Sequence, residues 1–165
     1  MIILGIDPGI AILGYGVIRL QGSRLSAEDY GAVYTRAYEP FPSRLSKLYD
    51  GMRELTDRFK PDAIAFEELF FCKNVATAMQ VGSARGVALL AAEQFGAPLY
   101  EYTPMQIKLA VTGNGHALKP QVQQMVKVLL NLKEAPKPDD VADALAVAIC
   151  HAHTSGPSLE QFRIK

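Results

Sequence analysis

The sequence lacks any apolar run long enough to cross a membrane. A membrane-spanning helix needs about 20 consecutive apolar residues, and none is found among these 165 residues. The first residues also lack the basic segment and small-residue cleavage site of a signal peptide. We therefore expect a soluble protein that does not bind membranes. A chain of this length is expected to form one domain with a substantial hydrophobic core.

Cysteine is scarce as well. Cys72 and Cys150 lie far apart, without the close spacing that metal-binding cysteines show. Apolar or small residues flank both, which is typical of buried free thiols. Free thiols favour a reducing compartment, so we expect a cytoplasmic protein.

Net charge is also missing. The sequence has 17 basic and 17 acidic residues, which gives a formal net charge of zero. Nucleic-acid-binding proteins tend to be basic, so this balance argues mildly against such a partner. A cluster of acids in one cleft can, however, mask basic residues gathered around it. The distribution of charge is therefore more informative than its sum.

The apolar pattern predicts an α/β fold. Short apolar or alternating segments predict strands at residues 2–6, 13–20, 25–34, 63–66 and 98–102. Helical spacing and flanking Pro or Gly predict helices at residues 43–59, 74–95, 105–111, 122–129 and 139–153. The link at Gly22 favours an antiparallel hairpin, and Ser43 is a candidate N-cap. A hairpin followed by alternating strands and helices indicates a mixed sheet flanked by helices.

The C-terminal tail differs from the rest of the chain. Residues 155–165 contain Gly and Pro and follow the last predicted helix. We take residues 1–154 as the folded domain and the tail as a candidate for disorder.

Acidic residues end two of the predicted strands. Asp7 follows the first strand and Glu67 follows the fourth. If these strands are parallel neighbours, both carboxylates emerge at the same edge of the sheet. The last helix adds Asp140 and Asp143, three residues apart on one helical face. Several hard oxygen ligands at one place are typical of a Mg²⁺ or Mn²⁺ site.

Simpler interpretations of these acids remain open on spacing alone. Asp7 precedes Pro-Gly and fits a turn residue. The acids that follow Pro138 fit first-turn residues that stabilise a helix dipole. Asp139 also competes with Asp140 as the partner of Asp143, because both spacings share a helical face.

Five segments together resemble the RuvC family of bacterial Holliday junction resolvases. They are GIDPG…GYGVI, AFEELFFCKN, GSARGVALLAA, PMQIKLAVTGNGHALKPQVQQMV and PDDVADALAVAICHAH. The resemblance runs in register from the first strand to about His153. One departure is the apolar stretch at residues 10–13, where the family often has polar residues.

The resemblance implies a ribonuclease H-like fold with a mixed five-stranded sheet flanked by helices. It also implies a homodimer that resolves four-way DNA junctions by paired, symmetric, metal-dependent nicks, leaving 5′-phosphate and 3′-hydroxyl ends. The expected partners are the junction and the RuvA and RuvB branch-migration proteins.

The resemblance also assigns the site. The catalytic and metal-binding acids are Asp7, Glu67, Asp140 and Asp143, so Asp140 is selected over Asp139 and Glu67 over Glu68. They are expected to hold two Mg²⁺ or Mn²⁺ ions per subunit, with Asp7 bridging both.

The family positions further imply DNA-binding residues. These are Phe70, Lys108 and Lys119, with Phe70 stacking on an unpaired base. Lys73 is a weaker candidate DNA-binding residue, for a contact to the DNA backbone. Arg85 is a weaker candidate for a backbone contact. On sequence alone, each lysine also fits a solvated surface charge, and an aromatic pair after a strand also fits the core.

The histidines form no ligand set. His151 and His153 come late in the last helix, where surface or helix-end positions are expected, and His116 lies in a glycine-rich loop.

Three other functions remain as alternatives. Sugar kinases and actin-like ATPases begin with a similar strand, but they need two such domains and a longer chain. A non-catalytic junction-binding module would use the acids only structurally. A nuclease for RNA–DNA hybrids would share the metal site and differ in substrate.

Overall fold

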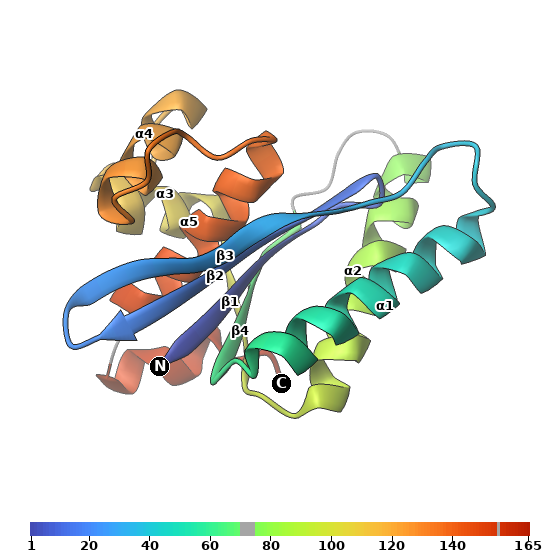
Figure 1. Cartoon of the computed structure of the whole chain (residues 1–165), viewed down its shortest axis with the longest axis horizontal. Coiled ribbons are helices and arrows are strands. Elements are labelled where there is room, and N and C mark those ends of the chain that lie inside the picture. The colour runs from blue at the N-terminus through green and yellow to red at the C-terminus, as the bar shows by residue number, and fades with distance from the viewer. Residues whose placement is uncertain (70–74, 155) are drawn as a thin grey trace.

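The computed structural model describes residues 1–69, 75–154 and 156–165 (Figure 1). Its strands are β1 (Ile2–Pro8), β2 (Ile12–Gln21), β3 (Arg24–Tyr34), β4 (Ala63–Glu67) and β5 (Leu99–Tyr102). Its helices are α1 (Phe41–Phe59), α2 (Val75–Phe95), α3 (Pro104–Thr112), α4 (Lys119–Leu129) and α5 (Asp139–His153), followed by the 3₁₀ helix η1 (Gly156–Phe162).

The strands form one mixed sheet in the order β3-β2-β1-β4-β5. β2 pairs antiparallel with β1 and with β3, whereas β4 pairs parallel with β1 and with β5. This confirms the predicted hairpin. It also meets the condition under which Asp7 and Glu67 emerge at the same edge of the sheet, since the first and fourth strands are parallel neighbours. Gly22 supplies the hairpin turn with a φ of 60°, which a residue with a side chain rarely adopts.

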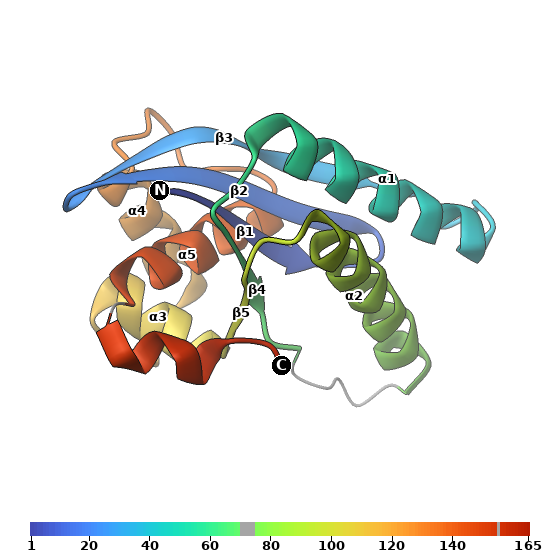
Figure 2. The same cartoon turned by 90° about the horizontal axis from the view of Figure 1, so that it is seen from below.

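Helices cover both faces of the sheet (Figure 2). α1 and α2 pack on one face against side chains such as Leu4, Ile6 and Phe66. α3, α4 and α5 pack on the other face, against Ile3 and Ile18 among others. Both apolar layers are closely filled, so the sheet is a rigid base for side chains at its edge. Among the described residues no helix is long and apolar enough to span a bilayer.

Helix α1 begins earlier than expected. Its N-cap is Pro40 and its first residue is Phe41, so Ser43 lies inside the first turn and the N-cap prediction was wrong. The reason is Pro42, since proline is tolerated in the first turn, where its missing N–H would have had no helical partner.

The tail also differs from the expectation of disorder. It contains η1, and beyond it Arg163 pairs with Tyr100 of the edge strand β5. The Ile164 N–H donates to the Leu99 carbonyl at 2.9 Å. The tail therefore covers the backbone of an edge strand that would otherwise be unpaired.

Of the two cysteines, Cys150 is a buried free thiol, as predicted. Cys72 lies outside the described residues.

Candidate active site

Two neighbouring strands carry Asp7 and Glu67 to the same place. β1 and β4 run parallel, and their last paired residues are Ile6 and Phe66. Asp7 and Glu67 follow directly, so the two carboxylates lie side by side. Asp7 is itself within β1, because that strand continues to Pro8 along β2, two residues beyond the segment predicted from sequence.

On helix α5, Asp139 has different surroundings from Asp140 and Asp143. Asp139 lies against α4, where its Oδ1 accepts from Gln123 Nε2 at 2.9 Å, and it is 60% exposed. Asp140 and Asp143 instead interact electrostatically with Asp7. The structure thus brings Asp7, Glu67, Asp140 and Asp143 together from three elements and leaves Asp139 at the rim.

Burial and mutual repulsion perturb these carboxylates. Burial raises the pKa of Asp7 to about 8, assisted by the charges of Glu67, Asp143 and Asp140. Burial also raises the pKa of Glu67 to about 7, with repulsion from Asp143 as the next cause. The pKa of Asp143 is raised by burial too, against the opposing ion pair with Lys119. Crowded acids of this kind gain most from a bound cation, which removes the repulsion.

Two lysines face the acids across a pocket of about 220 Å³. Its lining includes Glu67, Asp143, Lys108 and Lys119. Lys119 Nζ lies 2.8 Å from Asp143 Oδ2 and 3.5 Å from Asp139 Oδ2. Burial opposes the charge of Lys119, but these bonds outweigh it, so its pKa lies above the ordinary value. The zero net charge of the chain therefore conceals a local cluster of acids edged by basic side chains.

Glu68 belongs to a different part of the surface. It lines a separate pocket with Glu101 and Thr103, and its N–H donates to the Tyr102 carbonyl at 2.9 Å. Adjacent residues of a strand point to opposite faces. Glu67 therefore faces Asp143 while Glu68 does not.

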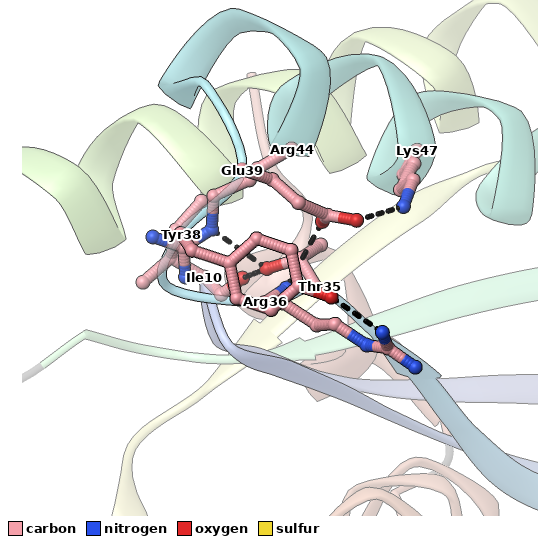
Figure 3. Close-up of polar contacts among 7 residues, drawn as sticks. All are labelled: Ile10, Thr35, Arg36, Tyr38, Glu39, Arg44 and Lys47. Carbon is pink, nitrogen blue, oxygen red and sulfur yellow. Dashed lines mark hydrogen bonds and ion pairs between the residues drawn. The ribbon is translucent and has the colours of Figure 1, made fainter.

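A polar network holds the turn that follows Asp7 (Figure 3). Thr35 Oγ1 donates to the Ile10 carbonyl at 2.5 Å, and Arg44 Nε donates to Thr35 Oγ1 at 2.8 Å. Thr35 and Arg44 are both buried. This network is not predictable from the sequence, because the partners are 25 and 9 residues apart and carry no motif.

A second buried contact joins α5 to the sheet. Tyr102 Oη lies 2.8 Å from His151 Nδ1, and both side chains are at most 2% exposed. Burial lowers the pKa of His151 to about 4. Of the two expected positions, surface or helix end, His151 takes only the second, because it lies in the last turn of α5 but is buried and neutral. His153 takes both, since it is exposed at the helix end, where its Nδ1 lies 3.1 Å from the Ala110 carbonyl.

The glycine-rich loop has structural reasons for its glycines. Gly113 ends α3 with a φ of 75°, and its N–H donates to the Leu109 carbonyl at 2.9 Å. A Cβ at Gly115 would lie 2.9 Å from Met105 Cγ. His116 in the same loop is exposed. Neither glycine needs a DNA contact to explain it.

Arg85 turns inward rather than toward a ligand surface. Its side chain is 15% exposed, pairs with Glu101 and lies over the Phe66 ring at 5.9 Å. Burial lowers the pKa of Arg85, against the favourable charge of Glu68. A backbone contact to DNA by Arg85 does not fit this position. Phe70 and Lys73 lie outside the described residues, so their predicted roles stay predictions.

Comparison with known proteins identifies the chain's family. The family model described as "Crossover junction endodeoxyribonuclease RuvC" matches residues 3–151. A curated relative of that name from Alkaliphilus metalliredigens is 58% identical over 165 residues, which covers 100% of both chains. The chain belongs to the RuvC family.

Solved RuvC structures agree with this fold. Thermus thermophilus RuvC superposes with a TM-score of 0.88 at 39% identity, over 99% of this chain and 100% of that one. The same protein in complex with a Holliday junction substrate matches with a TM-score of 0.88 at 37% identity, over 99% and 100% of the two chains. The predicted α/β fold of the ribonuclease H-like class with a mixed five-stranded sheet is thereby confirmed. The match to the RuvC family includes the strands that carry Asp7 and Glu67 and the helix that carries Asp143.

Proposed function

We propose that this chain is a crossover junction endodeoxyribonuclease that resolves Holliday junctions by paired, symmetric nicks. The observation that carries the proposal is the coupled set of carboxylates from β1, β4 and α5 beside a pocket with two lysines. Family membership supports it, as does the related RuvC solved with a Holliday junction substrate.

The four acids would hold two divalent ions per subunit, Mg²⁺ or Mn²⁺. Their oxygens are the ligands that these ions prefer. Burial, and then repulsion between the carboxylates, raises the pKa of Asp7 and of Glu67, so a nearby cation would favour their ionised forms. Within the described part of the chain, the acidic, His and Cys side chains form no group of three or more in position to hold a metal ion. A bound ion would compete with Lys119 for the carboxylate of Asp143.

When bound, the ions would supply the activation of a water molecule and neutralise charge on the leaving 3′ oxygen. The protein contributes the rest. Asp7 and Glu67 are fixed by two paired strands, and Lys119, which lines the same pocket, would contact the scissile phosphate. A cation at that position stabilises the charge that develops in the transition state. The expected products carry 5′-phosphate and 3′-hydroxyl ends.

Lys108 and Lys119 would bind the DNA backbone, since both line the pocket that contains the acids. Phe70 and Lys73 complete the proposed DNA contacts on the strength of the family resemblance alone. Phe70 would stack on an unpaired base at the crossover, an interaction worth about 1–3 kcal/mol.

The enzyme would act as a homodimer, because two symmetric nicks require two sites related by a two-fold axis. Helix α2 offers a surface for the contact. One side of it carries four exposed residues, Met79, Gly82, Gly86 and Leu90. Neither glycine has a neighbour within 4 Å of a built Cβ, so another helix can approach closely.

The resemblance further supports cooperation with RuvA and RuvB in the cytoplasm, where recombination intermediates of bacterial DNA arise. The buried, unpaired thiol of Cys150 is compatible with a reducing compartment.

The test is cleavage of a synthetic four-way junction beside a linear duplex and an RNA–DNA hybrid, in Mg²⁺, Mn²⁺ or EDTA. Paired nicks on the junction alone, lost in EDTA, are expected. Cleavage of the hybrid instead would replace the substrate and retain the metal site. Tight junction binding without nicking in either metal would contradict the proposal and favour a binding module.

A further inference from the structure

Helix α5 rests on glycines of the two central strands. On the face of the sheet that α5 covers, β1 contributes Gly5 and β2 contributes Gly14 and Gly16. Gly14 pairs directly with Asp7 across the ladder, and Gly16 pairs with Gly5. Residues paired in this way point to the same face, so the bare backbone of Gly14 lies beside the carboxylate of Asp7.

None of these positions has room for a Cβ. At Gly14 a built Cβ would lie 2.1 Å from the Asp140 carbonyl oxygen and 3.1 Å from the Asp140 Cβ. At Gly5 it would lie 2.1 Å from the Ala144 carbonyl oxygen. The backbone of α5 therefore lies directly on the backbone of the sheet, from its first turn onward.

The glycines are confined to the half of this face near the acids. Ile3 and Ile18, both fully buried, occupy the next positions on the same face toward the other end of the strands. Glycine is unfavourable inside a central strand and usually marks a close approach of another backbone. Here the approaching backbone is that of Asp140, one of the proposed metal ligands.

We infer that Gly14 is a positioning residue for the metal site. Because Gly14 has no side chain, the first turn of α5 can lie directly on β2. This brings the carboxylates of Asp140 and Asp143 close to that of Asp7. This inference rests on the proposed function, because it assumes that these acids bind a divalent ion.

The geometry predicts how large a displacement an alanine would cause. To move from 2.1 Å to at least 3.0 Å, the Asp140 carbonyl must shift by about 1 Å. Mg²⁺ requires oxygen ligands within a narrow range around 2.0–2.1 Å. A shift of that size at one ligand is therefore expected to weaken Mg²⁺ binding, in addition to any loss of folding stability.

The experiment compares Gly14→Ala with Gly51→Ala in the full-length protein. Gly51→Ala is the control, because its Cβ would also be too close to a neighbour, Val33 Cγ2 at 2.8 Å, but between α1 and β3 on the face of the sheet opposite α5. Two quantities are measured for each variant and the parent. The first is the midpoint temperature of thermal unfolding in EDTA. The second is the Mg²⁺ concentration at which half of the Mg²⁺-induced rise in that midpoint is reached. Neither depends on cleavage.

Both variants are expected to lose stability in EDTA. Gly14→Ala is expected to raise the half-saturating Mg²⁺ concentration at least tenfold, and Gly51→Ala less than threefold. Equal shifts in the two variants, or a parental value in Gly14→Ala, would overturn the inference and leave the metal site intact. A parent whose midpoint does not respond to Mg²⁺ or Mn²⁺ would refute the proposed metal site itself, and the inference with it.

Gly16→Ala covers the case in which Gly14→Ala does not fold. Its Cβ would lie 2.7 Å from the buried side chain of Leu145 and 2.9 Å from the Leu145 Cα, so the helix backbone must move less than it does at Gly14. A rise of about threefold in the half-saturating Mg²⁺ concentration supports the inference. An unchanged value with a lowered thermal midpoint in EDTA contradicts it.

Discussion

At Asp7, burial and three neighbouring carboxylates act on a single side chain. Its raised pKa means that the folded protein, without metal, binds a proton there more tightly than the unfolded chain does. The same holds for Glu67. The cost of ionising these acids is the residue-scale reason for a cation at the site.

This cost gives the metal-free protein a pH-dependent stability. A carboxyl whose pKa is raised on folding contributes stability at low pH and loses that contribution as the pH rises through the folded value. The free energy of unfolding in EDTA is therefore expected to fall between pH 6.5 and about 8.5. This range begins at the ordinary pKa of histidine, so the titration of His151 contributes little to the change. Mg²⁺ is expected to abolish the decline. Denaturant unfolding across this pH range measures it, and a rising stability in EDTA would contradict the assignment.

Asp7→Asn is expected to stabilise the metal-free protein at pH 8.5. The amide keeps the shape of the side chain and removes a charge that burial disfavours, for a gain on the order of 2 kcal/mol. Asp57→Asn, at an exposed surface position on α1, is the control, for which little change is expected. A destabilised Asp7→Asn protein would mean that the Asp7 carboxylate is paired in the native state.

Lys119 has two roles in this account, and a substitution separates them. Lys119→Met removes the cation that pairs with Asp143. It is expected to lower the half-saturating Mg²⁺ concentration and yet reduce junction cleavage by about 100-fold, because a phosphate contact is lost. Lys127→Met, in the last turn of α4, is the control. Cleavage by Lys119→Met at the parental rate would limit Lys119 to a surface ion pair.

At the scale of elements, α5 is attached to the sheet at both ends. Its first turn lies on Gly14, and its last turn is joined to β5 through Tyr102 and His151. Tyr102 also pairs with Glu67 in the sheet register. One buried contact thus links the strand beside Glu67 with the helix that carries Asp140 and Asp143.

Tyr102→Phe is expected to weaken this link. It leaves His151 Nδ1 buried without a partner, which costs about 1–3 kcal/mol. Thermal unfolding measures the loss, with the exposed Tyr30 changed to Phe as the control. An unaltered midpoint in Tyr102→Phe would show that the hydrogen bond contributes nothing net.

Much of this arrangement was predictable from the sequence, for identifiable reasons. Period-two and period-3.6 patterns located the strands and helices. The parallel pairing of β1 with β4, on which the meeting of Asp7 and Glu67 depends, was only a condition at that point. The start of α1 was missed because Pro42 fits a first turn better than Ser43 fits an N-cap. The Thr35–Arg44 and Tyr102–His151 contacts were missed because long-range polar pairs leave no local pattern.

The site shows the same limit. Spacing alone did not separate Asp139 from Asp140, and family resemblance selected the latter. In the structure the difference lies in helix orientation, which turns Asp139 toward Gln123 of α4. That orientation depends on how α4 packs on α5, which a pattern within α5 does not contain.

For the whole molecule, the expected two-fold dimer makes α2 the decisive surface. Gly86→Arg places a long charged side chain where another helix would approach, at a position where a built Cβ has no neighbour within 4 Å apart from the adjoining backbone of α2. We expect it to yield monomers in sedimentation velocity and to uncouple the two nicks. Gln124→Arg, an exposed position on α4, is the control. A dimeric Gly86→Arg protein would place the interface elsewhere.

The most direct test of the central claim is junction cleavage by Asp7→Asn in Mg²⁺, with junction binding measured on the same samples. If the acids from β1, β4 and α5 form a metal-dependent nuclease site, the variant binds the four-way junction like the parent and nicks it at least about 1,000-fold more slowly. Paired nicking by Asp7→Asn at close to the parental rate would contradict the account.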